Sequence, residues 1–144
     1  MNLLDVLTGS NWNAGLEIYD LLCRIKFRYN YTGTMEAGGA QVLRLIVNFK
    51  FQIIGEDRIK FEFLDTEGDI FFTNASFERT DLNAFRSVEF ELSEGPFVIS
   101  KPYLGASCYR YKLRFNLCPF PIGTDAEREF VEFYGWLEEE CVNK

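Results

Sequence analysis

The sequence predicts a mainly β (α+β) fold: a single antiparallel meander sheet, or a barrel, of about seven strands with a C-terminal amphipathic helix packed on it. Three observations predict this fold. Apolar and polar residues alternate over long stretches, which is typical of strands with one buried face. Aromatic residues make up 17% of the 144 residues, and aromatic side chains favour strands. Only residues 124–141 have the apolar spacing of a long helix.

The chain is long enough for one domain of ordinary size, so we expect a single domain over residues 1–144, with the β-meander over 21–118. Residues 2–7 are predicted to form a short helical turn. The first clear strand covers residues 21–31. Its apolar face consists of Cys23, Ile25, Phe27, Tyr29 and Tyr31, and its polar face of Arg24, Lys26, Arg28 and Asn30. Thr32–Ala40 is rich in glycine and is predicted to be a loop.

The strongest signal in the chain is a long β-hairpin over Val42–Asp65. Apolar residues occupy alternate positions up to Ile53, and the alternation resumes at Ile59 after a polar turn. Pairing residues whose numbers sum to 112 keeps both apolar rows on one side, whereas a slip of one residue would expose a whole row. This register pairs Phe51 with Phe61, Phe49 with Phe63, and Lys50 with Glu62.

Four further strands complete the predicted meander: Asp69–Glu78, Ala84–Leu92, Phe97–Lys101 and Cys108–Cys118. A turn at Glu94-Gly95-Pro96 is expected to separate the second of these strands from the third. In the last strand, Tyr109, Tyr111, Leu113, Phe115 and Leu117 face one way, and Arg110, Lys112, Arg114 and Asn116 face the other. The short connections favour hairpin neighbours over crossover connections.

The C-terminal helix is predicted over residues 124–141. Thr124 and Glu127 have the spacing of a capping box, in which each side chain bonds a backbone N–H at the helix start. The buried stripe would contain Phe130, Phe133, Tyr134, Leu137 and Cys141. Acidic residues concentrate in this segment, although the net charge of the whole chain is −7. Four of its glutamates are candidates for an acidic surface: Glu132, Glu138, Glu139 and Glu140.

Catalysis is not expected from this composition. The chain has no histidine, so a serine or cysteine nucleophile would lack its usual base. No cofactor and no metal site is predicted. The acids at Asp65, Glu67 and Asp69 alternate as in a calcium loop, but the distal glutamate of such a loop is missing, which favours a hairpin turn.

The four cysteines have no C-x-x-C spacing, and we expect them to be reduced. The first residues lack the positive segment of a signal peptide, and no run of 18 apolar residues is present. These features predict a cytoplasmic protein that does not contact membranes.

Two strands repeat one basic pattern, and this is the most specific clue to function. Arg24, Lys26 and Arg28 stand on one face of the first clear strand, and Arg110, Lys112 and Arg114 on one face of the last. We therefore predict a non-enzymatic protein that binds or blocks a protein partner through charged surfaces, the acidic helix first. The same bases could instead pair with Glu62, Glu89 and Glu91 on neighbouring strands. Nucleic acid is not an expected partner. The aromatic side chains lie on the strand face opposite the basic side chains, so they could not stack on nucleobases held by those cations.

Two resemblances accompany these expectations. Gly9-Ser10-Asn11-Trp12, which precedes the meander, is similar to the G-x-W start of the calycin (lipocalin and fatty-acid-binding) superfamily, with one additional residue. This resemblance implies a barrel that binds a small apolar or anionic ligand. The residues that would line its cavity are Phe27, Tyr29, Phe49, Phe51, Tyr109 and Tyr111. In composition, the chain also resembles the immunity and inhibitor proteins of bacteria and phages.

Overall fold

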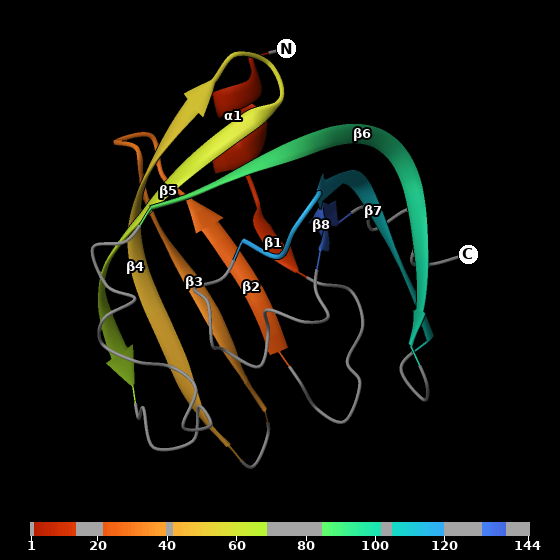
Figure 1. Ribbon diagram of the computed structural model, residues 1–144. Coiled ribbons are helices and arrows are strands. Elements are labelled where there is room, and N and C mark those ends of the chain that lie inside the picture. Colours follow the sequence, from red (N-terminus) through yellow and green to blue (C-terminus); the bar gives the residue numbers. More distant parts are fainter. Residues whose placement is uncertain are drawn as a thin grey trace.

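The computed structural model is a closed antiparallel barrel of eight strands in meander order, in which the first strand also pairs with the last (Figure 1). The structure describes residues 2–13, 22–39, 42–68, 85–101, 105–119 and 131–137. The elements are α1 (Leu3–Thr8), β1 (Asn11–Asn13), β2 (Leu22–Phe27), β3 (Thr32–Gly39), β4 (Val42–Ile54), β5 (Arg58–Gly68), β6 (Phe85–Lys101), β7 (Gly105–Phe115) and β8 (Glu132–Leu137). The mainly β fold is confirmed, and of the two sheet forms that the sequence left open, the structure shows the barrel.

The β4–β5 hairpin has the predicted register. Phe51 is opposite Phe61, Phe49 is opposite Phe63, and Lys50 is opposite Glu62. Gly55 in the connecting turn has a φ of 64°, a left-handed conformation that glycine adopts without steric cost. The hairpin places one row of aromatic rings inside the barrel and one row of polar side chains outside.

Aromatic rings fill the barrel next to α1. The Phe27 ring lies edge-on to Phe51 at 5.1 Å between centroids, and the Phe49 ring lies edge-on to Phe61 at 5.0 Å. Edge-to-face geometry of this kind adds about 0.5–1.5 kcal/mol per pair to the free energy of burial. The largest fully buried side chains include Trp12, Phe27, Phe49, Phe51, Phe61, Phe63, Phe115 and Phe133.

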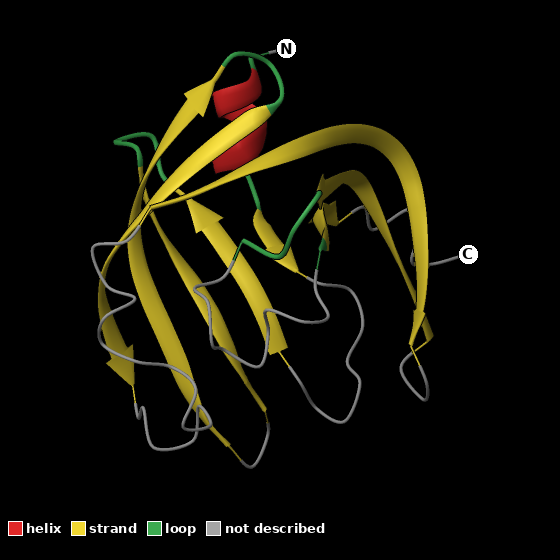
Figure 2. Ribbon diagram, in the orientation of Figure 1, coloured by secondary structure: helices red, strands yellow, loops and turns green. Residues whose placement is uncertain are grey.

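The predicted N-terminal helical turn is present as α1, which lies at one end of the barrel (Figure 2). The side chain of Asn2 caps this helix by accepting a hydrogen bond from the Leu4 N–H at 2.9 Å. The buried side chains of Val6 and Leu7 join the barrel core. The Trp12 indole N–H donates to the Leu7 carbonyl at 2.9 Å, which ties the helix to β1. No helix of the described residues is long and apolar enough to cross a lipid bilayer.

The predicted C-terminal helix is wrong for residues 132–137, because these residues form strand β8. Phe133 pairs with Leu113 of β7, and Tyr134 pairs with Asn13 of β1. The same residues also fit a two-residue period, with Phe133 and Gly135 buried. Pairing on both sides satisfies the backbone groups that two open sheet edges would leave without partners, and this outweighs the helical spacing. The remainder of the predicted helix, residues 124–130 and 138–141, lies outside the described residues apart from the connecting Val131.

Two predicted loops are strands. Thr32–Gly39 forms β3, and Gly33 fits between β2 and β4 because a Cβ at this position would overlap the Phe49 ring. The predicted turn at Glu94-Gly95-Pro96 is instead a register shift within the long strand β6, between Glu94 and Phe97. Figure 1 shows the result: β6 follows β5 and then curves away with β7. The predicted strand Asp69–Glu78 lies outside the described residues.

The prediction that all four cysteines are reduced is wrong for Cys108, which is disulfide-bonded. Cys118 is buried and is not part of a disulfide. The absence of C-x-x-C spacing argues against local cysteine motifs such as metal sites. It does not exclude a disulfide between two cysteines that the folded barrel brings together. A cytoplasmic location stays a prediction, and the disulfide weighs against it because disulfides persist mainly in oxidising compartments.

Candidate functional site: an aromatic and cationic surface on β6–β8

The barrel brings the two predicted basic strands into one neighbourhood. Across the sheet, Lys112 of β7 is opposite Tyr134 of β8, Tyr134 is opposite Asn13 of β1, and Asn13 is opposite Arg24 of β2. Neighbouring strands are about 4.8 Å apart, so Lys112 and Arg24 belong to one row about 14 Å long. The sequence could not show this row, because β1 and β8 were not predicted as strands.

Five aromatic side chains gather where β6, β7 and β8 meet. The Tyr134 ring lies 5.7 Å from the Tyr109 ring and 6.1 Å from the Phe97 ring. The Trp136 ring lies 5.9 Å from the Tyr111 ring, nearly perpendicular to it. These separations are within the range of favourable ring contacts.

Two cations lie against these rings. The Lys112 Nζ atom is 5.0 Å from the centroid of the Phe97 ring. The Arg110 guanidinium carbon is 5.3 Å from the Tyr111 centroid and 6.0 Å from the Trp136 centroid. Cations within about 6 Å of a ring centroid are attracted to the negative face of the ring. Below, the β6–β8 cluster denotes Phe97, Tyr109, Arg110, Tyr111, Lys112, Tyr134 and Trp136.

Acidic side chains border the cluster. Arg110 Nη2 lies 3.5 Å from Glu94 Oε1, and Lys112 Nζ lies 3.9 Å from Glu132 Oε2. The glutamates are open to solvent, so these pairs contribute little to the free energy of folding. A binding partner could therefore replace these ion pairs, or add charged groups to them, at a small cost in free energy.

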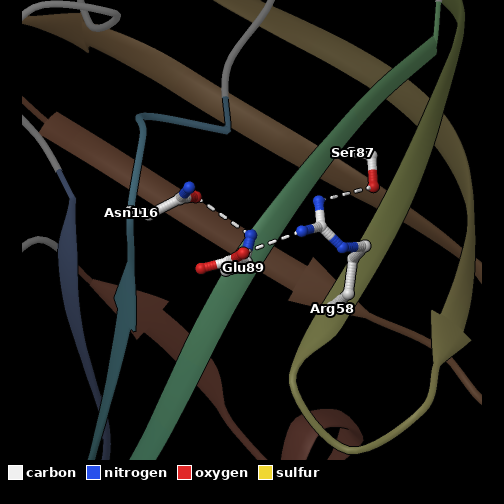
Figure 3. Close-up of polar contacts among 4 residues, drawn as sticks. All are labelled: Arg58, Ser87, Glu89 and Asn116. Carbon is white, nitrogen blue, oxygen red and sulfur yellow. Dashed lines mark hydrogen bonds and ion pairs between the residues drawn. The ribbon is translucent and has the colours of Figure 1, made fainter.

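Two of the six predicted basic residues form ion pairs in the described part of the chain, Arg110 with Glu94 and Lys112 with Glu132, and neither acid is among Glu62, Glu89 and Glu91. Glu89 is held by Arg58, whose Nη2 atom is 2.8 Å from Glu89 Oε1 (Figure 3). The backbone N–H of Glu89 also donates to the Asn116 side chain at 2.9 Å, and Arg58 donates to Ser87 at 3.3 Å. This network links β5, β6 and the end of β7, and it leaves Glu89 occupied away from the cluster. Glu91 is opposite Arg114 in the β6–β7 register.

Tyr134 titrates abnormally because of its surroundings. Burial raises the pKa of its phenol above 10.0, and the nearby negative charge of Glu132 raises the pKa further. The phenol also donates a hydrogen bond to Glu132 Oε2 at 3.2 Å. The hydrogen bond to Glu132 fixes the orientation of the phenol, which is neutral at neutral pH like that of any ordinary tyrosine.

Trp136 is the most exposed ring of the cluster, with 37% of its surface accessible. Its backbone has a φ of 59°, which is unfavourable for a residue with a bulky side chain. Three contacts hold it in place. The backbone N–H donates to Ser10 Oγ at 2.7 Å, the indole N–H donates to the Val6 carbonyl at 3.3 Å, and the ring covers Gly9. The indole is thus both rigid and accessible.

The other charged candidates are placed as follows. Arg24 donates to Asn13 Oδ1 at 3.0 Å, Lys26 is on β2, and the exposed Arg28 directly follows that strand. Arg114 is exposed on β7. Glu138, Glu139 and Glu140 lie outside the described residues.

The six cavity candidates do not share one place. Phe27, Phe49 and Phe51 are buried and pack on one another inside the barrel. Tyr29 is on the surface, where its hydroxyl donates to Asp5 at 2.8 Å, because β2 ends before it at Phe27. Tyr109 and Tyr111 are buried and belong to the β6–β8 cluster.

Sequence reasoning missed Phe97, Tyr134 and Trp136. The last two were assigned to a helix, and no local pattern indicates the left-handed backbone of Trp136. Comparison of the chain with protein-family models, curated proteins and solved structures finds no match. Among the described residues, no group of three or more cysteine or acidic side chains could hold a metal ion.

Proposed function

We propose that this protein is a non-enzymatic β-barrel that binds a protein partner through the β6–β8 cluster. One observation carries the proposal: a tryptophan that is 37% exposed and fixed in an unfavourable backbone conformation lies beside the Arg110 guanidinium. Tryptophan, tyrosine and arginine are the residues that dominate binding free energy in protein interfaces.

The arrangement also has the general layout of an interface. The exposed Trp136 and the partly exposed Phe97 and Tyr134 lie at the centre and contact the buried Tyr109 and Tyr111. The partly exposed ion pairs with Glu94 and Glu132 lie around them. Rigid side chains bind with less entropic cost, because they lose little freedom when a partner covers them. Trp136, fixed by Ser10 and Val6, meets this condition.

The proposal moves the binding surface away from the acidic segment. Of the four glutamates predicted there, Glu132 borders the cluster and neutralises Lys112. The alternative, a ligand inside the barrel, has less support, because Phe27, Phe49 and Phe51 occupy the interior near α1 with mutual ring contacts.

The test is site-specific photo-crosslinking in the cells that produce the protein. The photoreactive amino acid p-benzoylphenylalanine replaces Trp136 in one variant and the exposed Tyr29 in a matched control. We expect a covalent adduct with one defined protein from position 136 and none from position 29. The double substitution Arg110→Gln and Lys112→Gln should weaken the adduct, whereas Lys26→Gln with Arg28→Gln should leave it unchanged.

Two results would contradict the proposal. One is the absence of any protein adduct from position 136 while the variant stays folded. The other is the same adduct from both positions, which would indicate random encounters. Once the partner is purified, Trp136→Ala should raise the Kd at least tenfold, which is about 1.4 kcal/mol.

A further inference from the structure

A second surface feature lies on the outside of the β4–β5 hairpin, away from the β6–β8 cluster. It is a groove of about 600 Å³ between the β2–β3 turn and the start of β6. We name it the β4–β5 groove and define it by Tyr31, Lys50, Gln52, Ile54, Lys60 and Phe85. Its volume is in the range of small-molecule sites, about 300–1,000 Å³.

Several apolar side chains that lie outside the core are grouped in this groove. Of the seven large hydrophobic side chains that are exposed in the described part of the chain, Tyr31, Ile54 and Phe85 line this one groove. The Phe85 ring is 60% accessible. Apolar side chains scattered singly over a surface need no explanation, but a concave group of them indicates a binding site.

Tyr31 forms a rigid wall of the groove. Like Trp136, it has a left-handed backbone, with a φ of 62°. Its N–H donates to the Arg28 carbonyl at 3.1 Å, and its carbonyl accepts from the Phe51 N–H at 2.9 Å. Its ring lies 5.4 Å from the Phe51 ring. Glycine adopts such a conformation without steric cost, so tyrosine at this turn position carries a cost in backbone energy.

Two lysines give the groove its charge. Lys50 is opposite Glu62 and Lys60 is opposite Gln52, so the lysines are diagonal neighbours on adjacent strands, about 7–8 Å apart at the backbone. Lys60 Nζ lies 4.4 Å from the centroid of the Phe85 ring. Within the part of the chain that the structure describes, neither ammonium group has a carboxylate at ion-pair distance. With Glu62 included, the groove is net positive on a chain of net charge −7.

We propose that the β4–β5 groove binds a small aromatic carboxylate. The ring of the ligand packs against Phe85 and Tyr31, and its carboxylate meets the ammonium groups of Lys50 and Lys60. Charge complementarity selects the acid over a neutral molecule, and the concave apolar wall selects an aromatic body over a bare anion. This site is distinct from the proposed partner surface, because the two share no residue. Strand β6 contributes Phe85, its first residue, to the groove and Phe97 to the β6–β8 cluster.

The experiment is an NMR titration of the isotope-labelled protein with 2-naphthoate, and with the neutral 2-naphthamide as matched ligand. We expect 2-naphthoate to shift the backbone signals of Tyr31, Lys50, Lys60 and Phe85, with a Kd about tenfold lower than that of the amide. The double variant Lys50→Gln and Lys60→Gln should bind 2-naphthoate about tenfold more weakly. Lys26→Gln with Arg114→Gln, which removes two cations on β2 and β7 outside the groove, should leave the Kd unchanged.

Phe85→Ala provides a second test, because an exposed side chain can be truncated without loss of the fold. This substitution should raise the Kd for 2-naphthoate at least fivefold. The NMR spectrum of the variant should otherwise remain that of the folded protein. The proposal is overturned if the amide binds as tightly as the acid, if the lysine variant binds equally well, or if the shifted signals lie outside the groove. Binding of an acidic peptide at the groove in the absence of 2-naphthoate binding would also overturn it.

Discussion

The hydroxyl of Tyr134 and the carboxylate of Glu132, two residues apart on β8, are joined by a hydrogen bond of 3.2 Å. Burial and this carboxylate both raise the pKa of the phenol above 10.0. The folded protein therefore holds the phenolic proton more tightly than the unfolded chain does. The contribution to stability is fully present below pH 10 and is lost as the pH rises through the folded pKa.

This relationship gives the first prediction. The free energy of unfolding of the wild type, measured by urea titration, should fall as the pH rises above 10, and Tyr134→Phe should flatten this fall. Glu132→Gln should lower the pKa of the Tyr134 phenol toward 10.0. This pKa is read from tyrosinate absorbance, with the signal of the other tyrosines taken from Tyr134→Phe. An identical pH profile in the wild type and Tyr134→Phe would contradict the assignment.

The second prediction concerns the backbone of Trp136. Replacing a strand residue by glycine usually costs more stability than replacing it by alanine. Here the order should be reversed, because glycine relieves the left-handed strain at φ 59° while alanine keeps it. Trp136→Ala should be less stable than Trp136→Gly by about 1 kcal/mol in urea unfolding. The usual order would show that the backbone relaxes in the variants.

The third prediction concerns Gly135, which lets β8 approach β1. A Cβ at this position would lie 2.8 Å from Ser10 Oγ and 2.9 Å from Cε3 of the Trp12 ring. Gly135→Ala should therefore lower the free energy of unfolding by about 1–3 kcal/mol through overpacking. Gly55→Asn is the matched control, because a Cβ at Gly55 would meet Asp57 Oδ1 at an ordinary contact distance of 4.0 Å and asparagine tolerates a positive φ. Equal effects of the two substitutions would refute the close packing.

The fourth prediction concerns the disulfide of Cys108. The chain has four cysteines, so one disulfide leaves two thiols to react with Ellman's reagent in denaturant, and all four should react after reduction. Cys108→Ser should lower the free energy of unfolding by about 2–5 kcal/mol. Protein purified without reductant that shows four reactive thiols would favour the reduced state and the cytoplasmic location.

The sequence predicted the parts of the fold that depend on local patterns. The pairing of Phe51 with Phe61 follows from a two-residue period and a short turn, both of which lie within one stretch of chain. Strand β8 does not follow from such a pattern. Phe133, Tyr134 and Leu137 fit a helical stripe, and they form a strand because they pair with β7 on one side and, at Tyr134, with Asn13 on the other.

The same limit applies to the candidate site. Arg110, Lys112 and Glu132 were predicted as binding residues from their charge, and Tyr109 and Tyr111 from their place on an apolar face. No local pattern indicates that these residues lie together, because ring contacts across β6–β8 depend on barrel closure. The exposure of Trp136 depends in addition on a single backbone angle.

Barrel closure has a consequence for slow motions of the molecule. In the described residues, β1 and β8 are joined by a single register pair, Asn13 and Tyr134, whereas β4 and β5 are paired from Leu45 to Ile54. Trp136 reinforces this narrow seam through Ser10 and Val6. Fluctuations that open the ring should therefore begin there, and amide hydrogen exchange should be fastest at this seam. A partner that covers Trp136 would stabilise the closed pairing of β1 with β8 and slow that exchange.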